Sequence, residues 1–334
     1  AVTLKDIANE LGVSISTVSR ALRDHSDISP EIIKKVKKLA IEKNYIPNPL
    51  AMGLRRQQTR MIGVIVPDIV THFYSSVISG IEDTAKENGY YILIASSSES
   101  LEKEKIAVQN LLKSRVEGLI ICISQETDNY EHFEPLIKNE IPIVFFDRVP
   151  ETVKVPSVIV DGMKAAKNIV RHFFDSGCRK IAYISGPEHL NISRQRKKGY
   201  IEGLKETGLK FVPEYLIECK LTIHDAKKAT QKLLDLEDRP DAIFGINDTV
   251  AFAAMREIKN KDLNIPSDIA LVGFTDDFHA TVVDPALTSV THPTKMMGRE
   301  AAKLFFEQIS KEEIVFEQKV LEAELVIRES SLKG

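Results

Sequence analysis

Tryptophan is absent from this 334-residue chain, aromatic residues make up 7% of it, and there are three cysteines, Cys122, Cys178 and Cys219. An odd number of widely spaced cysteines argues against a disulfide framework or a thiolate metal site and is typical of a reducing compartment. No apolar run approaches the ~20 residues that span a bilayer, and the first residues lack the apolar core of a signal peptide. We therefore expect a cytoplasmic protein with no membrane segment, metal or cofactor.

The sequence motifs of common enzyme classes are missing as well. There is no Gly-x-Gly-x-x-Gly after a strand, no phosphate-binding Gly-Lys-Ser/Thr loop, no His-Glu-x-x-His and no Gly-x-Ser-x-Gly elbow. Asp276, Asp277 and His279 resemble a catalytic cluster, but no nucleophile accompanies them. We therefore predict that the protein is not an enzyme.

Charge is distributed unevenly along the chain. Residues 1–60 hold eleven Lys and Arg against six Asp and Glu, whereas the remainder holds 34 basic and 42 acidic residues. A composition of 43% hydrophobic and 28% charged residues is typical of a globular protein, and the length suggests about two or three folding units. A small basic module on a large acidic body indicates a nucleic-acid binder with a separate sensing part.

The first 45 residues have the pattern of three short helices. Leu4, Ile7, Ala8 and Leu11 recur at helical spacing, Thr3 precedes them as a cap, and Gly12 ends them. A second helix follows Ser14, and a third follows the pair Ser29-Pro30. Two short helices joined by a tight turn and supported by a third predict a helix-turn-helix.

The second helix of this module is polar on its outer face, which suits the major groove of DNA. Arg20 is the best candidate for reading a base, because bidentate Arg–guanine pairing is the commonest specific contact. Ser14, Thr17, Ser19 and Arg23 are assigned to phosphates, which position the protein without specifying sequence. The alternative is an ordinary three-helix bundle with a polar surface.

Several motifs of the chain resemble the lactose-repressor/galactose-repressor (LacI–GalR) family. They are Thr3-Leu4-Lys5-Asp6-Ile7-Ala8, Gly12-Val13-Ser14, Thr17-Val18-Ser19-Arg20 and Asn44-Tyr45-Ile46-Pro47-Asn48. The resemblance extends over nearly the whole chain and implies that Ile15, Ser16 and Arg20 read bases. The complete set of predicted DNA-binding residues is Thr3, Ser14, Ile15, Ser16, Thr17, Ser19, Arg20, Arg23 and Leu54.

Leu54 belongs to a short basic linker. The resemblance implies that this linker is a hinge helix ordered on the operator, with Leu54 wedged into the central base step of the minor groove. The chain departs from the family at Met52-Gly53, and a glycine costs about 1 kcal/mol inside a helix. We therefore expect a hinge that melts easily.

From residue 61 onward, short apolar runs alternate with amphipathic stretches, which predicts parallel sheets covered by helices on both faces. The expected strands are Ile62–Val66, Tyr91–Ala95, Leu119–Ile123, Ile143–Phe146, Val158–Val160, Ile181–Ser185, Ala242–Ile246, Ile269–Phe274, Leu287–Val290 and Val320–Arg328. The expected helices are Tyr74–Asn88, Glu102–Ser114, Met163–Ser176, Arg194–Thr207, Ile223–Leu236, Thr249–Lys259 and Met296–Ile309.

The fold class expected is an all-α helix-turn-helix module followed by an α/β body of two doubly wound lobes, as in periplasmic binding proteins. The predicted boundaries are 1–46 for the DNA-binding domain, 47–60 for the hinge and 61–334 for the effector-binding and dimerisation domain. Lobe 1 spans about 61–160 plus 292–321, and lobe 2 about 162–290 plus 322–334. The resemblance implies the chain crossings near 161, 291 and 320–323, and a homodimer because no heptad tail follows.

Polar side chains directly after the predicted strands suit a polyhydroxylated ligand, since carboxylates and Arg bind hydroxyls and an aromatic face covers C–H surface. The resemblance places the following residues in an effector pocket: Phe73, Tyr74, Ser124, Asp147, Arg196, Asn247 and Asp276. Asp248, next to Thr249 at a helix start, is expected to be a helix cap instead.

These patterns predict a transcriptional regulator, a repressor, that binds a near-palindromic operator and is controlled by a sugar or sugar phosphate between two lobes. Two alternatives keep the DNA-binding role but replace the sugar by a purine or by a phosphorylated protein. A third is a stand-alone sugar-binding receptor, which the basic N-terminal module disfavours. A sugar-acting enzyme is the remaining possibility.

Overall fold

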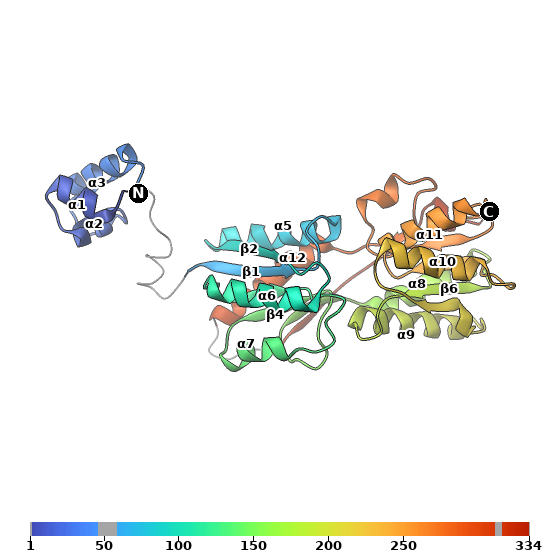
Figure 1. Cartoon of the computed structure of the whole chain (residues 1–334). Coiled ribbons are helices and arrows are strands. Elements are labelled where there is room, and N and C mark those ends of the chain that lie inside the picture. The colour runs from blue at the N-terminus through green and yellow to red at the C-terminus, as the bar shows by residue number, and fades with distance from the viewer. Residues whose placement is uncertain (1, 46–58, 311–315, 334) are drawn as a thin grey trace. The chain divides into compact units, whose positions relative to one another are not determined.

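The computed structural model describes residues 2–45, 59–310 and 316–333, which form two compact units, Ala1–Thr59 and Arg60–Gly334 (Figure 1). The predicted hinge residues, Leu54 among them, lie outside the described residues. None of the helices within the described ranges is long and apolar enough to cross a membrane.

The first unit contains the three predicted helices, α1 (Leu4–Leu11), α2 (Ile15–Ala21) and α3 (Pro30–Glu42). Thr3, Ser14 and Ser29 are their N-caps, and each side chain accepts a hydrogen bond from a backbone N–H of the first turn. Gly12 ends α1 in the left-handed conformation, with φ 63°. The helices share a core that includes Ile7, Ala8, Val18, Ala21 and Val36, because none of them is long enough to be stable alone.

The first lobe of the second unit is built on a six-stranded sheet with the order β11-β5-β4-β3-β1-β2 and parallel pairing throughout. Its strands are β1 (Met61–Val66), β2 (Tyr91–Ser96), β3 (Leu119–Ile121), β4 (Ile143–Phe146), β5 (Ser157–Val160) and β11 (Gln318–Leu321). The strands β1, β3, β4 and β5 are buried, whereas β2 is an edge strand with an exposed Tyr91.

The second lobe has a four-stranded parallel sheet with the order β7-β6-β8-β9. Its strands are β6 (Ile181–Ser185), β7 (Leu216–Glu218), β8 (Ala242–Gly245) and β9 (Ala270–Val272). A short antiparallel pair, β10 (Ser289–Val290) with β12 (Leu325–Val326), accompanies it. The predicted two-lobed α/β fold class is confirmed.

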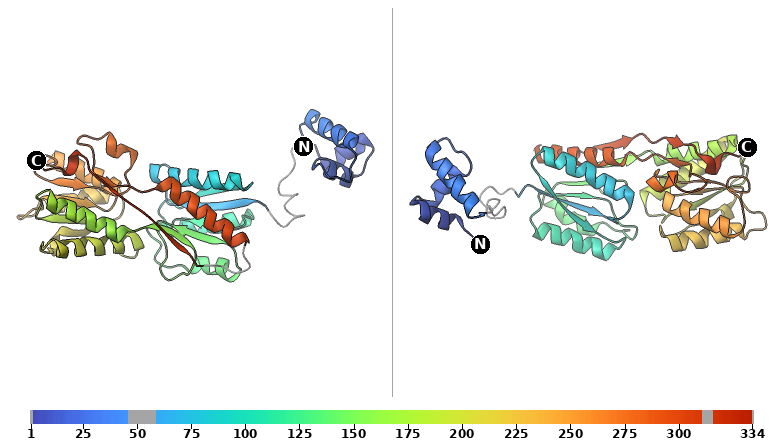
Figure 2. Two further views of the ribbon diagram at one scale, coloured as in Figure 1. Left: turned by 180° about the vertical axis from the view of Figure 1, so that it is seen from behind. Right: turned by 90° about the horizontal axis from the view of Figure 1, so that it is seen from above.

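Helices cover the sheets as Figures 1 and 2 show. In the first lobe they are α5 (His72–Glu87), α6 (Leu101–Lys113), α7 (Glu134–Lys138) and α12 (Thr294–Ser310). In the second lobe they are α8 (Gly162–Asp175), α9 (Asn191–Glu206), α10 (Ile223–Leu234) and α11 (Asp248–Asn260). Short 3-10 turns lie at Glu131–Phe133, Pro213–Tyr215, Phe278–Thr281 and Glu329–Ser331.

The C-terminal segment differs from the sequence prediction. The run Val320–Arg328, expected to be one strand, forms β11 in the first lobe and β12 in the second. The predicted strand Leu287–Val290 is reduced to the two residues of β10. The run Val320–Arg328 is divided because the chain passes from one lobe to the other between Leu321 and Leu325, and one continuous strand cannot pair with both sheets.

Helices α5 and α12 lie side by side and approach closely through two glycines (Figure 2). A Cβ added at Gly80 would lie 2.1 Å from the carbonyl oxygen of Lys295, and one added at Gly298 would lie 2.0 Å from that of Val77. Both obstacles are backbone atoms of the opposite helix, so a side chain at either position would force the helices apart.

Overpacking at Gly80 costs about 1–3 kcal/mol, and alanine gains about 1 kcal/mol over glycine in helix propensity. We therefore expect Gly80→Ala to lower the free energy of unfolding by up to about 2 kcal/mol. Urea unfolding of the full chain measures the difference, with Glu82→Ala at an exposed position of the same helix as the control. Equal or greater stability of Gly80→Ala would show that the helices are not held at this distance.

Candidate functional site

The outer face of α2 is the candidate DNA-contacting surface of the first unit. Ser14, Ile15, Ser16 and Arg20 are exposed, while Val18 on the opposite face is fully buried. The exposed fraction of Ile15 is 47%, which leaves an apolar group among hydroxyls at the start of the helix. This arrangement matches what the major groove requires, because base edges offer both hydrogen-bonding groups and the thymine methyl.

The predicted phosphate-binding residues are held in place by one another. Ser14 Oγ lies 2.7 Å from Ser16 Oγ and 2.8 Å from Thr17 Oγ1, and Arg23 Nη2 donates to Ser19 Oγ at 2.6 Å. Thr3 is part of a capping box, in which its hydroxyl accepts from Asp6 N–H and Asp6 accepts from Thr3 N–H. The side chains are therefore ordered in the first unit itself.

The second unit contains a cavity of about 290 Å³ between its lobes. Strand ends and helix starts of both lobes line it, as is usual for ligand sites in parallel α/β sheets. The lining residues are Asp68, Thr71, Phe73, Tyr74, Glu99, Asp147, Arg148, Ile192, Arg196, Leu221, Ile223, Asn247, Asp248, Thr249, Thr275 and Asp277. Five of the seven residues predicted for an effector pocket are among them.

Arg196 is the buried cation of this cavity. Its exposed fraction is 2%, its Nη1 donates to the carbonyl oxygen of Ile246 at 2.6 Å, and its guanidinium lies 3.6 Å from the ring centroid of Phe274. Burial lowers the pKa of the guanidinium, and the charge of Asp147 opposes that shift. The Nε atom is buried without a hydrogen-bond partner, so donor capacity remains for a ligand.

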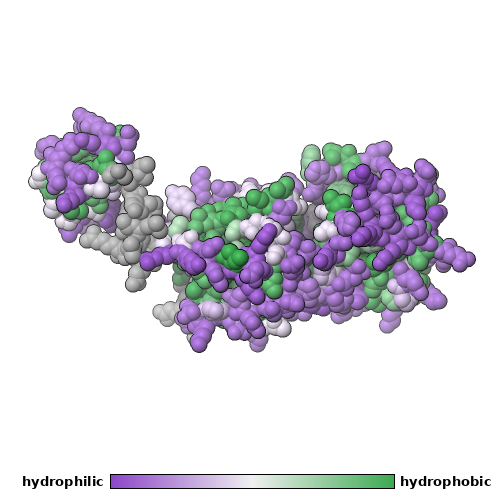
Figure 3. Space-filling view, in the orientation of Figure 1, coloured by the Kyte–Doolittle hydropathy of each residue, from purple (hydrophilic) through white to green (hydrophobic). Residues whose placement is uncertain are grey.

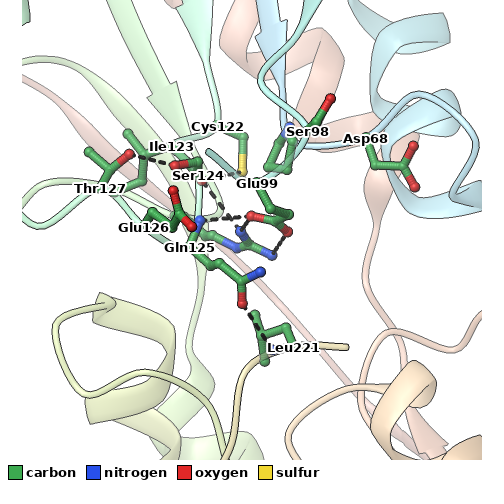
Figure 4. Close-up of polar contacts among 12 residues, drawn as sticks. Asp68, Ser98, Glu99, Cys122, Ile123, Ser124, Gln125, Glu126, Thr127 and Leu221 are labelled. Carbon is green, nitrogen blue, oxygen red and sulfur yellow. Dashed lines mark hydrogen bonds and ion pairs between the residues drawn. The ribbon is translucent and has the colours of Figure 1, made fainter. Parts of the chain in front are cut away.

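Arg148, the other cation, is neutralised within the first lobe. Its two terminal nitrogens donate to Glu99 at 2.7 and 3.0 Å, the bidentate geometry of strong ion pairs. Glu99 also accepts from the backbone N–H of Gln125, and the Gln125 side chain accepts from Leu221 N–H of the second lobe at 2.9 Å (Figure 4). This chain of contacts joins the cavity wall to a contact between lobes.

A second contact between the lobes lies at the start of α9. The Asn191 side chain accepts from Val149 N–H at 3.0 Å and donates to the carbonyl oxygen of Asp147 at 3.0 Å. His189 Nε2 is 2.7 Å from the carbonyl oxygen of Gln125. The backbone carrying Asp147 is thus held by the second lobe, although Asp147 belongs to the first.

His292 lies next to Asp147, on the segment that runs from β10 in the second lobe to α12 in the first. Its side chain is fully buried between Phe73 and Phe274, and its Nε2 is 3.5 Å from Asp147 Oδ1. Burial lowers the pKa of His292 to about 4, although the charge of Asp147 opposes this. Burial therefore favours the neutral imidazole at the point where its Nε2 approaches Asp147.

The start of α11 differs from the sequence prediction in the roles of two neighbours. Asn247, not Asp248, is the N-cap, since its Oδ1 accepts from Val250 N–H at 2.9 Å. Asp248 is buried in the cavity wall, where it accepts from Ser289 Oγ and from Asp277 N–H, both at 2.6 Å. Burial raises the pKa of Asp248 to about 6.

Asp276 and Ser124, both predicted to contact the effector, do not line the cavity. Asp276 pairs with Arg328 at 2.7 Å, and the next residue, Asp277, lines the cavity instead. Ser124 is fully buried, with its hydroxyl 2.8 Å from Thr127 Oγ1. Asp276 follows β9 in a loop and has a left-handed backbone with φ 48°, so the alternation of a strand does not give the direction of its side chain.

Comparison with known proteins assigns both units to one family. Residues 3–48 match the model described as "Bacterial regulatory proteins, lacI family", and residues 59–328 match "Periplasmic binding proteins and sugar binding domain of LacI family". The chain belongs to the LacI family of bacterial regulatory proteins. It is a DNA-binding transcriptional regulator with an effector-binding body, which confirms the predicted family, fold class and regulatory function.

The relatives of this LacI-family chain are similar over their full length. It is 32% identical to the HTH-type transcriptional repressor CytR of Escherichia coli (strain K12), over 99% of this chain and 96% of that one. It is 35% identical to catabolite control protein A of Priestia megaterium, over 94% of each. The crystal structure of the lac repressor dimer bound to operator and the anti-inducer ONPF is 29% identical over 99% of both chains, with a TM-score of 0.88.

We expect Asp248→Asn to change how the stability of the regulator depends on pH. A carboxyl with pKa near 6 when folded and about 4 when unfolded binds more protons in the folded state, so ionising it lowers the free energy of unfolding as pH rises from about 4 to 6.5. The variant lacks this loss, so its free energy of unfolding should rise relative to that of wild type across this pH range, by up to about 3 kcal/mol.

Urea unfolding of both proteins at several pH values between 4.5 and 7.5 measures this difference. Asp262→Asn, which removes a carboxyl group at an exposed position outside the cavity lining, is the control for the loss of one acidic group. A constant difference between wild type and Asp248→Asn would mean that Asp248 ionises as in water.

Proposed function

We propose that this regulator is a repressor that senses an uncharged, polyhydroxylated small molecule carrying no phosphate. The observation that carries the proposal is the charge of the cavity. Five carboxylates line it, from Asp68, Glu99, Asp147, Asp248 and Asp277, against the two guanidiniums of Arg148 and Arg196. Since Glu99 already neutralises Arg148, a bound phosphate would face Arg196 and four other carboxyl groups.

Hydroxyl groups suit these carboxylates, because an ionised carboxylate accepts hydrogen bonds and donates none. Arg196 supplies a donor for a ring or hydroxyl oxygen, and the rings of Phe73 and Tyr74, edge to face at 4.9 Å, give the apolar wall that C–H surface needs. Sugar recognition also agrees with the family description and with the similar transcriptional regulator CelR, whose solved structure is a cellobiose complex (27% identity, 99% of this chain, TM-score 0.74).

The other parts of the proposal concern DNA, assembly and location. Residues 1–46 bind the operator, 47–60 form the hinge with Leu54, and 61–334 bind the effector in two lobes. Arg20 reads a base, together with Ile15 and Ser16. A regulator of operator DNA acts in the cytoplasm, and effector binding must favour one lobe arrangement to change operator affinity.

A homodimer is supported by the uncovered edge of the first lobe. Strand β2 ends the six-stranded sheet, and apolar side chains gather over this lobe (Figure 3). Tyr91 and Ile94 on β2 and Ile106 on α6 are 77%, 47% and 47% exposed. An uncovered edge strand with apolar side chains is a liability in a monomer, and a dimer would carry the two helix-turn-helix modules that a near-palindromic operator requires.

Thermal unfolding with matched ligand pairs tests the effector class: ribose with ribose 5-phosphate, glucose with glucose 6-phosphate, and adenosine and cytidine with their monophosphates. A ligand at 100 times its Kd stabilises by about 2.7 kcal/mol. We expect one neutral member to stabilise the protein and its phosphorylated partner not to. Arg196→Ala should abolish the effect, while Lys198→Ala, exposed on the same helix, should keep it. Stabilisation by a phosphorylated member alone would contradict the proposal.

We expect Arg20→Ala to relax base preference and to cost about 1–3 kcal/mol on the preferred site. Selection of bound sequences from a randomised DNA library by the full-length protein measures this preference. Lys35→Ala, which removes an exposed cation of α3 paired with Glu31, is the control and should keep the base preference of wild type. An Arg20→Ala protein that selects the same sequences as wild type would reject the assigned role.

A further inference from the structure

An acidic residue just after the DNA-facing helix holds the arginine of that helix. Asp27 lies in the segment between α2 and α3, and its Oδ2 accepts from Arg20 Nη1 at 2.6 Å. Its Oδ1 is 2.5 Å from His25 Nδ1. The side chains of Arg20 and Asp27 are 54% and 42% exposed, so the pair contributes little to folding stability. In the first unit the pair gives the guanidinium one direction, toward Asp27.

The other carboxylates of residues 2–45 are engaged elsewhere. Asp6 completes the cap of α1, and the remaining acids pair with lysines: Glu10 with Lys43, Asp24 with Lys37, Glu31 with Lys35, and Glu42 with Lys38. Among residues 2–45, Asp27 is the acid that forms an ion pair with a side chain of α2, that of Arg20. Its placement therefore differs from that of the solvated charges around it.

We propose that Asp27 is a specificity-determining residue, which orients Arg20 toward one base and weakens binding to DNA of any other sequence. The inference rests on the proposed role of Arg20 in reading a base. It assigns to Asp27 no contact with DNA of its own, and the partner remains double-stranded operator DNA.

The orienting effect follows from the geometry of the guanidinium. Arginine presents five N–H donors in a rigid planar fork, and Asp27 takes one of them, on Nη1. The donors that remain can still reach the two acceptors, O6 and N7, that guanine offers in the major groove. A side chain fixed before binding loses less conformational entropy when the correct base is present.

The selective effect follows from charge. Binding to arbitrary DNA is carried by attraction to phosphates, and a carboxylate near the binding face opposes it at every sequence alike. An Arg20 already paired with Asp27 is also less available to phosphates. The gain from an oriented Arg20 occurs at one base alone, so the ratio of specific to non-specific affinity rises.

The test compares the full-length wild-type protein with Asp27→Asn, Asp24→Asn and Arg20→Ala. Each is used to select sites from a randomised DNA library and is then titrated against the selected site and a scrambled duplex. Asp24→Asn is the matched control, because it removes the same charge three residues away, from a carboxylate paired with Lys37 on α3.

We expect Asp27→Asn to bind scrambled DNA roughly threefold more tightly and to lose at least about fivefold in discrimination at one base position. That position should be the one that Arg20→Ala also relaxes. Asp24→Asn should bind scrambled DNA more tightly as well, while it keeps the base preference of wild type, which separates loss of charge from loss of orientation.

Two results overturn the inference about Asp27 alone, and a third overturns it together with the role of Arg20. If Arg20→Ala relaxes a base position and Asp27→Asn does not, Asp27 does not orient Arg20, and the role of Arg20 stands. If Asp24→Asn relaxes the same position as strongly as Asp27→Asn, the effect is one of net charge alone. Should Arg20→Ala leave the selected sequence unchanged, the assignment of base reading to Arg20 fails first, and the role given to Asp27 falls with it.

Discussion

The buried guanidinium of Arg196 is the constraint on which the cavity between the lobes depends. Moving a charge out of water is costly unless its environment compensates, and among the described residues no carboxylate forms an ion pair with it. The compensation comes from the carbonyl oxygen of Ile246, the face of Phe274 and the nearby charge of Asp147. The end of β8, the end of β9 and the first lobe must therefore all meet at the start of α9.

The same arrangement explains how a ligand can act on the whole body of the regulator. Asp147 belongs to the first lobe, but its carbonyl oxygen is bound by Asn191 of the second. Glu99 lines the cavity and also binds Gln125, which contacts Leu221 across the lobes. Under the proposed function, a ligand bound between Asp147 and Arg196 would act on these contacts, and regulation requires that it bind one lobe arrangement more tightly than another.

Positions after strands, together with the family resemblance, predicted a pocket, and five of its predicted residues line the cavity: Phe73, Tyr74, Asp147, Arg196 and Asn247. The prediction failed in the loop after β9, where Asp276 has a positive φ and strand alternation no longer gives side-chain direction. Asp276 turns to Arg328 while Asp277 lines the cavity. Asp248 was mistaken for a cap because either of two adjacent polar residues can begin a helix; Asn247 caps α11, and Asp248 binds Ser289 and the backbone of Asp277 instead.

The sequence by itself determined the three capped helices at the N-terminus, the alternation of buried strands and amphipathic helices, and the family, because these features depend on local spacing and capping. Only the tertiary structure decided that Val320–Arg328 is divided between two lobes, that Asp27 holds Arg20, and that the cavity contains more carboxylates than cations. Such pairings join segments far apart in the chain or depend on side-chain direction, and periodicity carries no information about either.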